Sequence, residues 1–125
     1  MKQTIIFSGT CAANSELTLV SKRIEFPFNL IKFVPSFALG TNKTLQLKLY
    51  ISKDKVAPTT GTPSGINILG LFGEDPYVIG DDEQKSLDLM IEYKDSGYYI
   101  KVYANNTDNF GHTVDTFVII ESLED

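Results

Sequence analysis

The chain has one cysteine, one histidine and no tryptophan among its 125 residues. A single cysteine, Cys11, excludes a disulfide within the chain, and therefore a small fold held together by disulfides. A single histidine, His112, leaves a zinc site without a ligand pair, and no Gly-x-Ser-x-Gly motif is present to form a Ser–His–Asp triad with it. We interpret Cys11 as a buried thiol and His112 as an ordinary residue at the start of a strand. The chain also lacks nucleotide-binding glycine motifs, so we expect neither enzymatic activity nor an organic cofactor.

Long apolar runs are absent as well. The run nearest the N-terminus, Ile5–Phe7, ends at Ser8. A signal peptide needs roughly 7–15 apolar residues and a membrane-spanning helix about 18. We expect no signal peptide and no transmembrane segment, and hence a protein that is cytoplasmic when made or is incorporated in a virion that leaves by lysis.

Basic residues are too few to attract polyanions. Lysine and arginine total 11 against 16 aspartates and glutamates, which gives a formal net charge of -5. Because this balance repels phosphate backbones and anionic lipid, we expect no nucleic-acid partner and no membrane partner.

What the chain does have is alternation of apolar and polar residues with a period of two. It is clearest in residues 44–51, 87–94, 99–104 and 114–120. Such alternation places one face of a strand on a core and leaves the other face wetter. The core residues that it predicts are Leu45, Leu47, Leu49, Leu87, Leu89, Ile91, Ile100 and Val102.

Further strands are expected at residues 3–8, 16–21, 29–37 and 66–72, and no segment has the apolar spacing of a long helix. About eight short strands separated by glycine, proline, asparagine and aspartate are typical of a sandwich or barrel. We therefore expect residues 1–125 to form a single all-β domain, an antiparallel, jelly-roll-like β-sandwich.

The alternation on both sides of Lys94–Gly97 favours one particular turn. A four-residue loop at Lys94–Gly97 would pair Tyr93 with Tyr98 and Ile91 with Ile100. All apolar side chains then lie on one face of a hairpin, whereas a one-residue shift would place a lysine on that face. Gly97 would supply the positive φ that such a turn needs.

Aromatic residues give the clearest indication of binding. Tyr50, Tyr99 and Tyr103 fall on the polar faces of their strands, with Lys101 among them. If these side chains are exposed, they can stack on sugar rings or contact another protein. Tyrosine is also common on the outer face of a strand for purely structural reasons.

Four phenylalanines indicate association between copies. Phe26, Phe28, Phe33 and Phe37 surround two prolines and fall on both faces of an alternating strand. Because one face of a thin sandwich cannot bury them all, we expect some of them to be covered by a second subunit in a homo-oligomer.

An acidic loop suggests a calcium site. Asp75, Asp81, Asp82 and Glu83 lie near each other, and carboxylates on loops are ligands that calcium uses. The spacing is not that of an EF-hand. A solvated acidic turn and a calcium site are therefore both open interpretations.

Two segments, Ala38-Leu39-Gly40-Thr41-Asn42-Lys43-Thr44-Leu45 and Tyr50-Ile51-Ser52-Lys53-Asp54, resemble small β-sandwich modules of tailed-bacteriophage virions, namely capsid-decorating and tail-associated proteins. The resemblance is one of style and size, with no diagnostic motif. It implies a non-enzymatic, self-associating module that binds a larger protein lattice. The alternative is a carbohydrate-binding module that uses the tyrosines or the loop tips.

Overall fold

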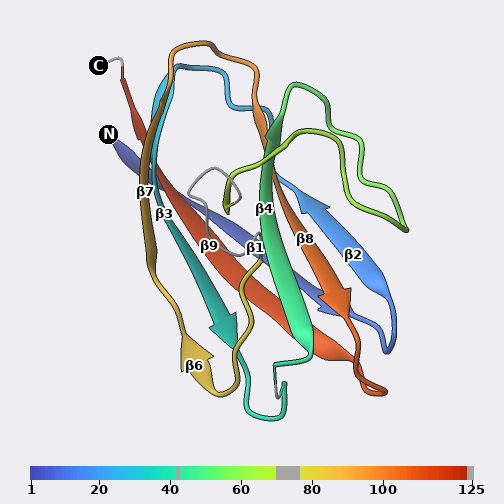
Figure 1. Ribbon diagram of the computed structural model, residues 1–125. Coiled ribbons are helices and arrows are strands. Elements are labelled where there is room, and N and C mark those ends of the chain that lie inside the picture. Colours follow the sequence, from blue (N-terminus) through green and yellow to red (C-terminus); the bar gives the residue numbers. More distant parts are fainter. Residues whose placement is uncertain (42, 70–76, 124–125) are drawn as a thin grey trace.

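A computed structural model of the chain describes residues 1–41, 43–69 and 77–123. In these ranges nine strands form two antiparallel sheets that lie face to face (Figure 1). Sheet A contains β1 (Lys2–Cys11), β9 (His112–Ser122), β3 (Phe28–Phe37), β7 (Leu87–Tyr93) and β6 (Glu83–Gln84). Sheet B contains β2 (Glu16–Val20), β8 (Tyr99–Asn106), β4 (Leu45–Ser52) and β5 (Ile66–Asn67). The expected all-β sandwich is confirmed.

The strands pair in a nested order. β1 pairs with β9, β2 with β8, β3 with β7, and β4 with β5. The first strand therefore lies beside the last, the second beside the last but one, and so on toward the middle of the chain. A long hairpin rolled into two sheets gives this pairing, which is the jelly-roll arrangement.

The nested order shows that the predicted hairpin between β7 and β8 is wrong. β7 pairs with β3 in sheet A, whereas β8 pairs with β2 and β4 in sheet B. Residues 94–97 therefore cross from one sheet to the other. Tyr93 and Tyr98 do meet, with ring centroids 5.2 Å apart, but through an edge-on ring contact and not as partners in a ladder.

The apolar members of the alternating segments fill the space between the sheets, as expected. Leu45, Leu47, Leu49, Leu89, Ile100 and Val102 are buried, and Leu87 and Ile91 pack against them from partly buried positions. β9 contributes Val114, Val118 and Ile120 from the opposite sheet. The period-two pattern therefore identified the core correctly.

The expectation that some of the four phenylalanines are covered by a second subunit is also corrected by the structure. Phe28, Phe33 and Phe37 are buried in the protein's own core, and Phe26 packs against it. A shift in register between Leu30 and Lys32 inserts one extra residue of β3 opposite β9. Because this bulge reverses the alternation, phenylalanines on both sides of it face inward. Phe28, Phe33 and Phe37 therefore supply no surface for a second subunit, whereas Phe26 is only partly buried.

The remaining differences lie in the connections. The strand expected at residues 66–72 is only Ile66–Asn67 in the structure, and residues 70–72 lie outside the described ranges. β6 was not expected from the sequence. Within the described part of the chain, no helix has the length and apolarity needed to cross a bilayer.

Replacing Leu89 by alanine should destabilise the fold by about 2–5 kcal/mol, because it leaves a cavity between the sheets. Leu89 is 6% exposed. Its neighbour Met90 is 68% exposed, so Met90→Ala is a matched control that should change stability by less than about 0.5 kcal/mol. Guanidinium unfolding measures both, and equal effects would show that Leu89 is not a core residue.

Gly97 has the positive φ that the sequence indicated, +90°. A valine there should cost about 1–3 kcal/mol, because a β-branched residue strains at this φ. The added Cβ would also lie 2.8 Å from the Arg23 guanidinium, which can move aside. Gly111 meets no atom closer than 3.6 Å, so Gly111→Val is the control. A melting temperature that falls equally in both variants would contradict a special backbone role for Gly97.

Candidate functional site

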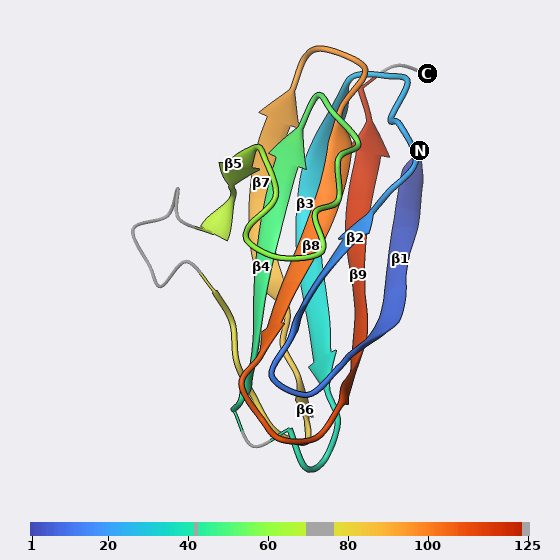
Figure 2. The same cartoon turned by 90° about the vertical axis from the view of Figure 1, so that its right-hand side faces the viewer.

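The tyrosine surface predicted on sheet B is mostly covered. Tyr50 is 8% exposed, Tyr103 3%, and Lys101 is fully buried, so the expectation that these side chains are exposed is wrong. Tyr99 is half-buried. Residues 53–65, which we call the strap, fold back over the outer face of sheet B, and Figure 2 shows them passing in front of β8.

An ion pair between the buried Lys101 and the partly exposed Asp54 anchors the strap. The Lys101 ammonium donates to Asp54 Oδ1 at 2.8 Å and to the Ser64 hydroxyl oxygen at 3.1 Å. The Ser64 hydroxyl also donates to the Asp54 carboxylate at 2.7 Å. Because a buried cation is costly without partners, both ends of the strap are held where they satisfy Lys101.

A second anchor holds the tip of the strap. The Tyr103 hydroxyl donates to Glu16 Oε1, and the Gly61 amide donates to Glu16 Oε2 at 2.8 Å. These two bonds hold the pKa of the Glu16 carboxyl below its usual value, while burial raises the pKa of Tyr103. The Tyr103 hydroxyl is therefore engaged within the chain and is not presented to a ligand.

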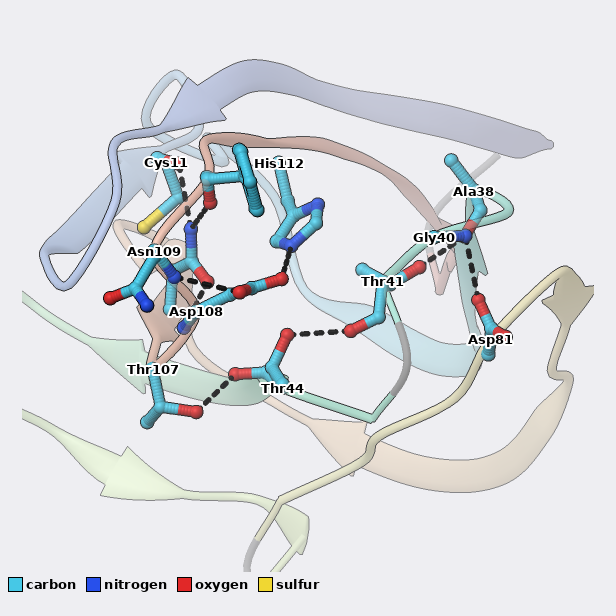
Figure 3. A network of polar contacts seen from close by, with 12 residues as sticks. Cys11, Ala38, Gly40, Thr41, Thr44, Asp81, Thr107, Asp108, Asn109 and His112 are labelled. Carbon is cyan, nitrogen blue, oxygen red and sulfur yellow. Dashed lines mark hydrogen bonds and ion pairs between the residues drawn. The ribbon is translucent and has the colours of Figure 1, made fainter.

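In the described part of the acidic loop, Asp81 has a structural role. The Asp81 carboxylate accepts a hydrogen bond of 2.9 Å from the Gly40 amide and so joins two loops (Figure 3). Asp82 and Glu83 are exposed, and Asp75 lies outside the described residues. Within the ranges described, no three His, Cys, Asp or Glu side chains gather as metal ligands would. The calcium site remains an expectation from the sequence.

His112 and Cys11 lie at the same end of the sandwich. His112 is the first residue of β9, and its Nε2 lies 2.8 Å from Asp108 Oδ2 (Figure 3). This contact lowers the pKa of the Asp108 carboxyl. Cys11 is fully buried, and burial raises the pKa of its thiol. Both residues have the structural surroundings that the sequence suggested.

The surface that the sequence analysis missed is the outer face of sheet A. The register places Ile6, Phe117 and Val34 side by side on β1, β9 and β3. Ile6 is 71% exposed, Phe117 is half-buried and Ile119 lies one position along the same face. The alternation in residues 114–120 carried the signal, because Phe117 and Ile119 occupy positions that should be polar.

A cavity opens beside β1 as well. It has a volume of about 500 Å³ and is lined by Gln3–Ile6, Val20–Ile24, Phe26 and Ile120. Ile5, Ile24 and Ile120 are apolar side chains of its wall, and Lys22 and Arg23 are its charged residues. Arg23 is paired with Glu25 at 2.6 Å. The cavity therefore lies next to the edge of sheet A, between β1 and the segment that follows β2.

No protein-family model matches the chain, and no curated protein matches its sequence. Several solved structures are similar to it at low identity and low TM-score. The mitogen derived from Yersinia pseudotuberculosis is 9% identical with a TM-score of 0.44, over 100% of this chain and 90% of that one. TmCBM61, solved with β-1,4-galactotriose, is 8% identical with a TM-score of 0.44, over 94% of this chain and 86% of that one.

The VP2 subviral particle of infectious bursal disease virus is similar in the same sense. It is 7% identical with a TM-score of 0.42, over 96% of this chain but only 33% of the VP2 chain. This chain therefore spans about a third of that viral protein. At such identities the three likenesses concern the sandwich fold alone.

The Asp54 anchor should make the strap sensitive to acid. Hydrogen bonds from Lys101 and Ser64 lower the pKa of Asp54 from 3.8 to about 2. A carboxyl with a lowered pKa stabilises the folded form above its usual pKa and ceases to do so as the pH falls through its folded pKa. The near-ultraviolet circular dichroism of Tyr50 and Tyr103 should therefore change between about pH 4 and pH 2.

Asp54→Asn is the matched control for this titration. Asparagine cannot ionise, so the change in that pH range should be reduced in the variant to the part that Glu16 contributes. An identical titration in the two proteins would show that another group controls the strap.

Proposed function

We propose that the chain is a non-enzymatic structural module that self-associates and takes its place in a protein lattice, as capsid-decorating or tail-associated proteins of a virion do. The observation that carries this proposal is the apolar row of Ile6, Phe117 and Ile119 on the outer face of sheet A, a face that also carries the charged residues Lys32, Asp88 and Asp115. The proposal of a virion protein rests on the resemblance in the sequence, and the proposal of self-association rests on this face.

An antiparallel sheet that packs on a core with one face normally turns polar residues outward on the other. Sheet A departs from this rule at Ile6, Phe117 and Ile119, although its inner face is already filled by Val114, Val118 and Ile120. Met90 adds a 68% exposed apolar side chain on β7. The fold does not need these outward side chains, so a contact between subunits is the use that fits them.

The conspicuous polar side chains support the non-enzymatic part of the proposal. Lys101 pairs with Asp54, Tyr103 with Glu16, and His112 with Asp108. The first pair joins a loop to a strand, the second joins β2 to β8, and the third joins β9 to the loop before it. Each side chain therefore has a partner within the fold.

A carbohydrate-binding function would require a binding surface other than the covered tyrosines. With the strap closed, Tyr50 and Tyr103 are covered, so a sugar would have to bind at loop tips or after the strap opens. Binding of the wild-type chain to a glycan array, with a monomeric state in solution, would favour that alternative and contradict the structural one.

Sedimentation velocity at micromolar to millimolar concentration tests the proposal. The wild-type chain should sediment as a species heavier than its 13.9 kDa monomer. Phe117→Glu should weaken this association at least about tenfold, because it places a charge on the apolar face. Met90→Glu changes a 68% exposed side chain and should also weaken it without disturbing the fold.

Thr113→Glu is the matched control, because Thr113 is exposed and lies on the same strand and the same face, away from the apolar row. A wild-type chain that stays monomeric throughout, or an assembly that tolerates both Phe117→Glu and Met90→Glu, would contradict the proposal.

A further inference from the structure

β1 is the outermost strand of sheet A, and Figure 2 shows it at the edge of the molecule. Its register with β9 begins with a hydrogen bond from the Ser122 amide to the Met1 carbonyl. Because bonded and non-bonded pairs alternate in an antiparallel ladder, the odd-numbered residues of β1 bond to β9. The backbone groups of Thr4, Ile6 and Ser8 therefore point away from the sheet.

The other edges of the two sheets are protected against pairing, and β1 is not. β5 and β6 have two residues each, and β2 has five and begins with Glu16. β7 carries the charged Asp88 and Glu92 and a positive φ at Met90. Short strands, charges and irregularities are the usual devices that prevent pairing at an edge.

β1 has none of these devices over most of its length. It is ten residues long, pairs regularly with β9, and has no proline and no charged residue from Gln3 to Cys11. In a chain with a net charge of -5, this uncharged strand is a place where a second copy meets no repulsion from the strand itself.

The strand is also complementary to itself. If two copies of β1 pair antiparallel about Ile6, Ile6 meets its own copy and Thr4 meets Ser8 on the outer face. Ile5 then meets Phe7 on the inner face, and Lys2 meets Thr10, so no charge opposes a like charge. We propose that two copies of this chain join through their β1 edges about a two-fold axis and form one continuous sheet.

This inference rests on the proposed self-association and specifies its geometry. Four strands about 4.8 Å apart and seven to eleven residues long give sheet A an outer face of roughly 450–700 Å², below the ~800 Å² that one partner contributes to a standard interface. Joining two copies through β1 places their apolar rows end to end and doubles that face. Edge pairing thereby turns two small surfaces into one of sufficient area.

Thr4→Pro tests the edge directly. Proline removes the outward amide of Thr4 but none of the bonds to β9, so the monomer should fold normally. Two intermolecular bonds are lost, one from each copy, and the dimer dissociation constant should rise by about tenfold or more. Thr4→Ala retains the amide and is the matched control. Its dissociation constant should stay within about threefold of the wild-type value.

Amide hydrogen exchange in the wild-type chain gives a second measurement that needs no variant. The amides of Thr4, Ile6 and Ser8 should become protected as concentration rises, while those of Ile5 and Phe7 are protected at every concentration. Rapid exchange of the three outward amides in a dimeric sample would overturn the inference.

The outcomes separate the inference from the proposed function. A chain that is monomeric at all concentrations contradicts both. An assembly that persists equally in Thr4→Pro, with unprotected outward amides, contradicts edge pairing alone and leaves association through the outer face of sheet A in place.

Discussion

The apolar layer between the two sheets determines which parts of this protein remain for a partner. Nested pairing of the strands brings residues from both halves of the chain into that layer, and the bulge in β3 turns Phe28 and Phe33 toward it from opposite sides of one irregularity. Once these side chains are inside, Ile6 and Met90 remain exposed on the outer face of sheet A, and Leu39, Val56, Ile66 and Phe110 remain exposed elsewhere. Ile6 lies in register with Phe117 and Val34 on neighbouring strands, and this row is therefore the candidate interface.

The sequence predicted the core and the fold class because period-two alternation reports directly on which face of a strand is buried. Alternation does not report on the partner of a strand. Ile91 and Ile100 both face inward whether β7 and β8 share a sheet or lie in opposite ones, so the hairpin was consistent with the pattern and still wrong. Nor does it show a bulge, and it therefore misplaced the phenylalanines.

The candidate site was harder to predict because a polar outer face can be covered by another part of the same chain. Tyr103 and Lys101 have the spacing of exposed residues, but the strap lies over them. The partners that bury Lys101, Asp54 and Ser64, are 47 and 37 residues away in sequence, and no local pattern connects them. The ion pair between buried Lys101 and partly exposed Asp54 adds little net stability, but it selects one position for the strap.

The two sheets therefore differ in whether another segment of the chain covers their outer faces. Sheet B is closed by its own strap, and its edges are short or charged. Sheet A has an apolar row on its outer face and one long unprotected edge, an arrangement that would lead to open-ended growth if the edge could pair with any other strand. Antiparallel pairing of β1 with its own copy uses both free edges at once, so the sheet has no further β1 edge to extend. A two-fold contact of this kind makes an unprotected strand compatible with an assembly of finite size.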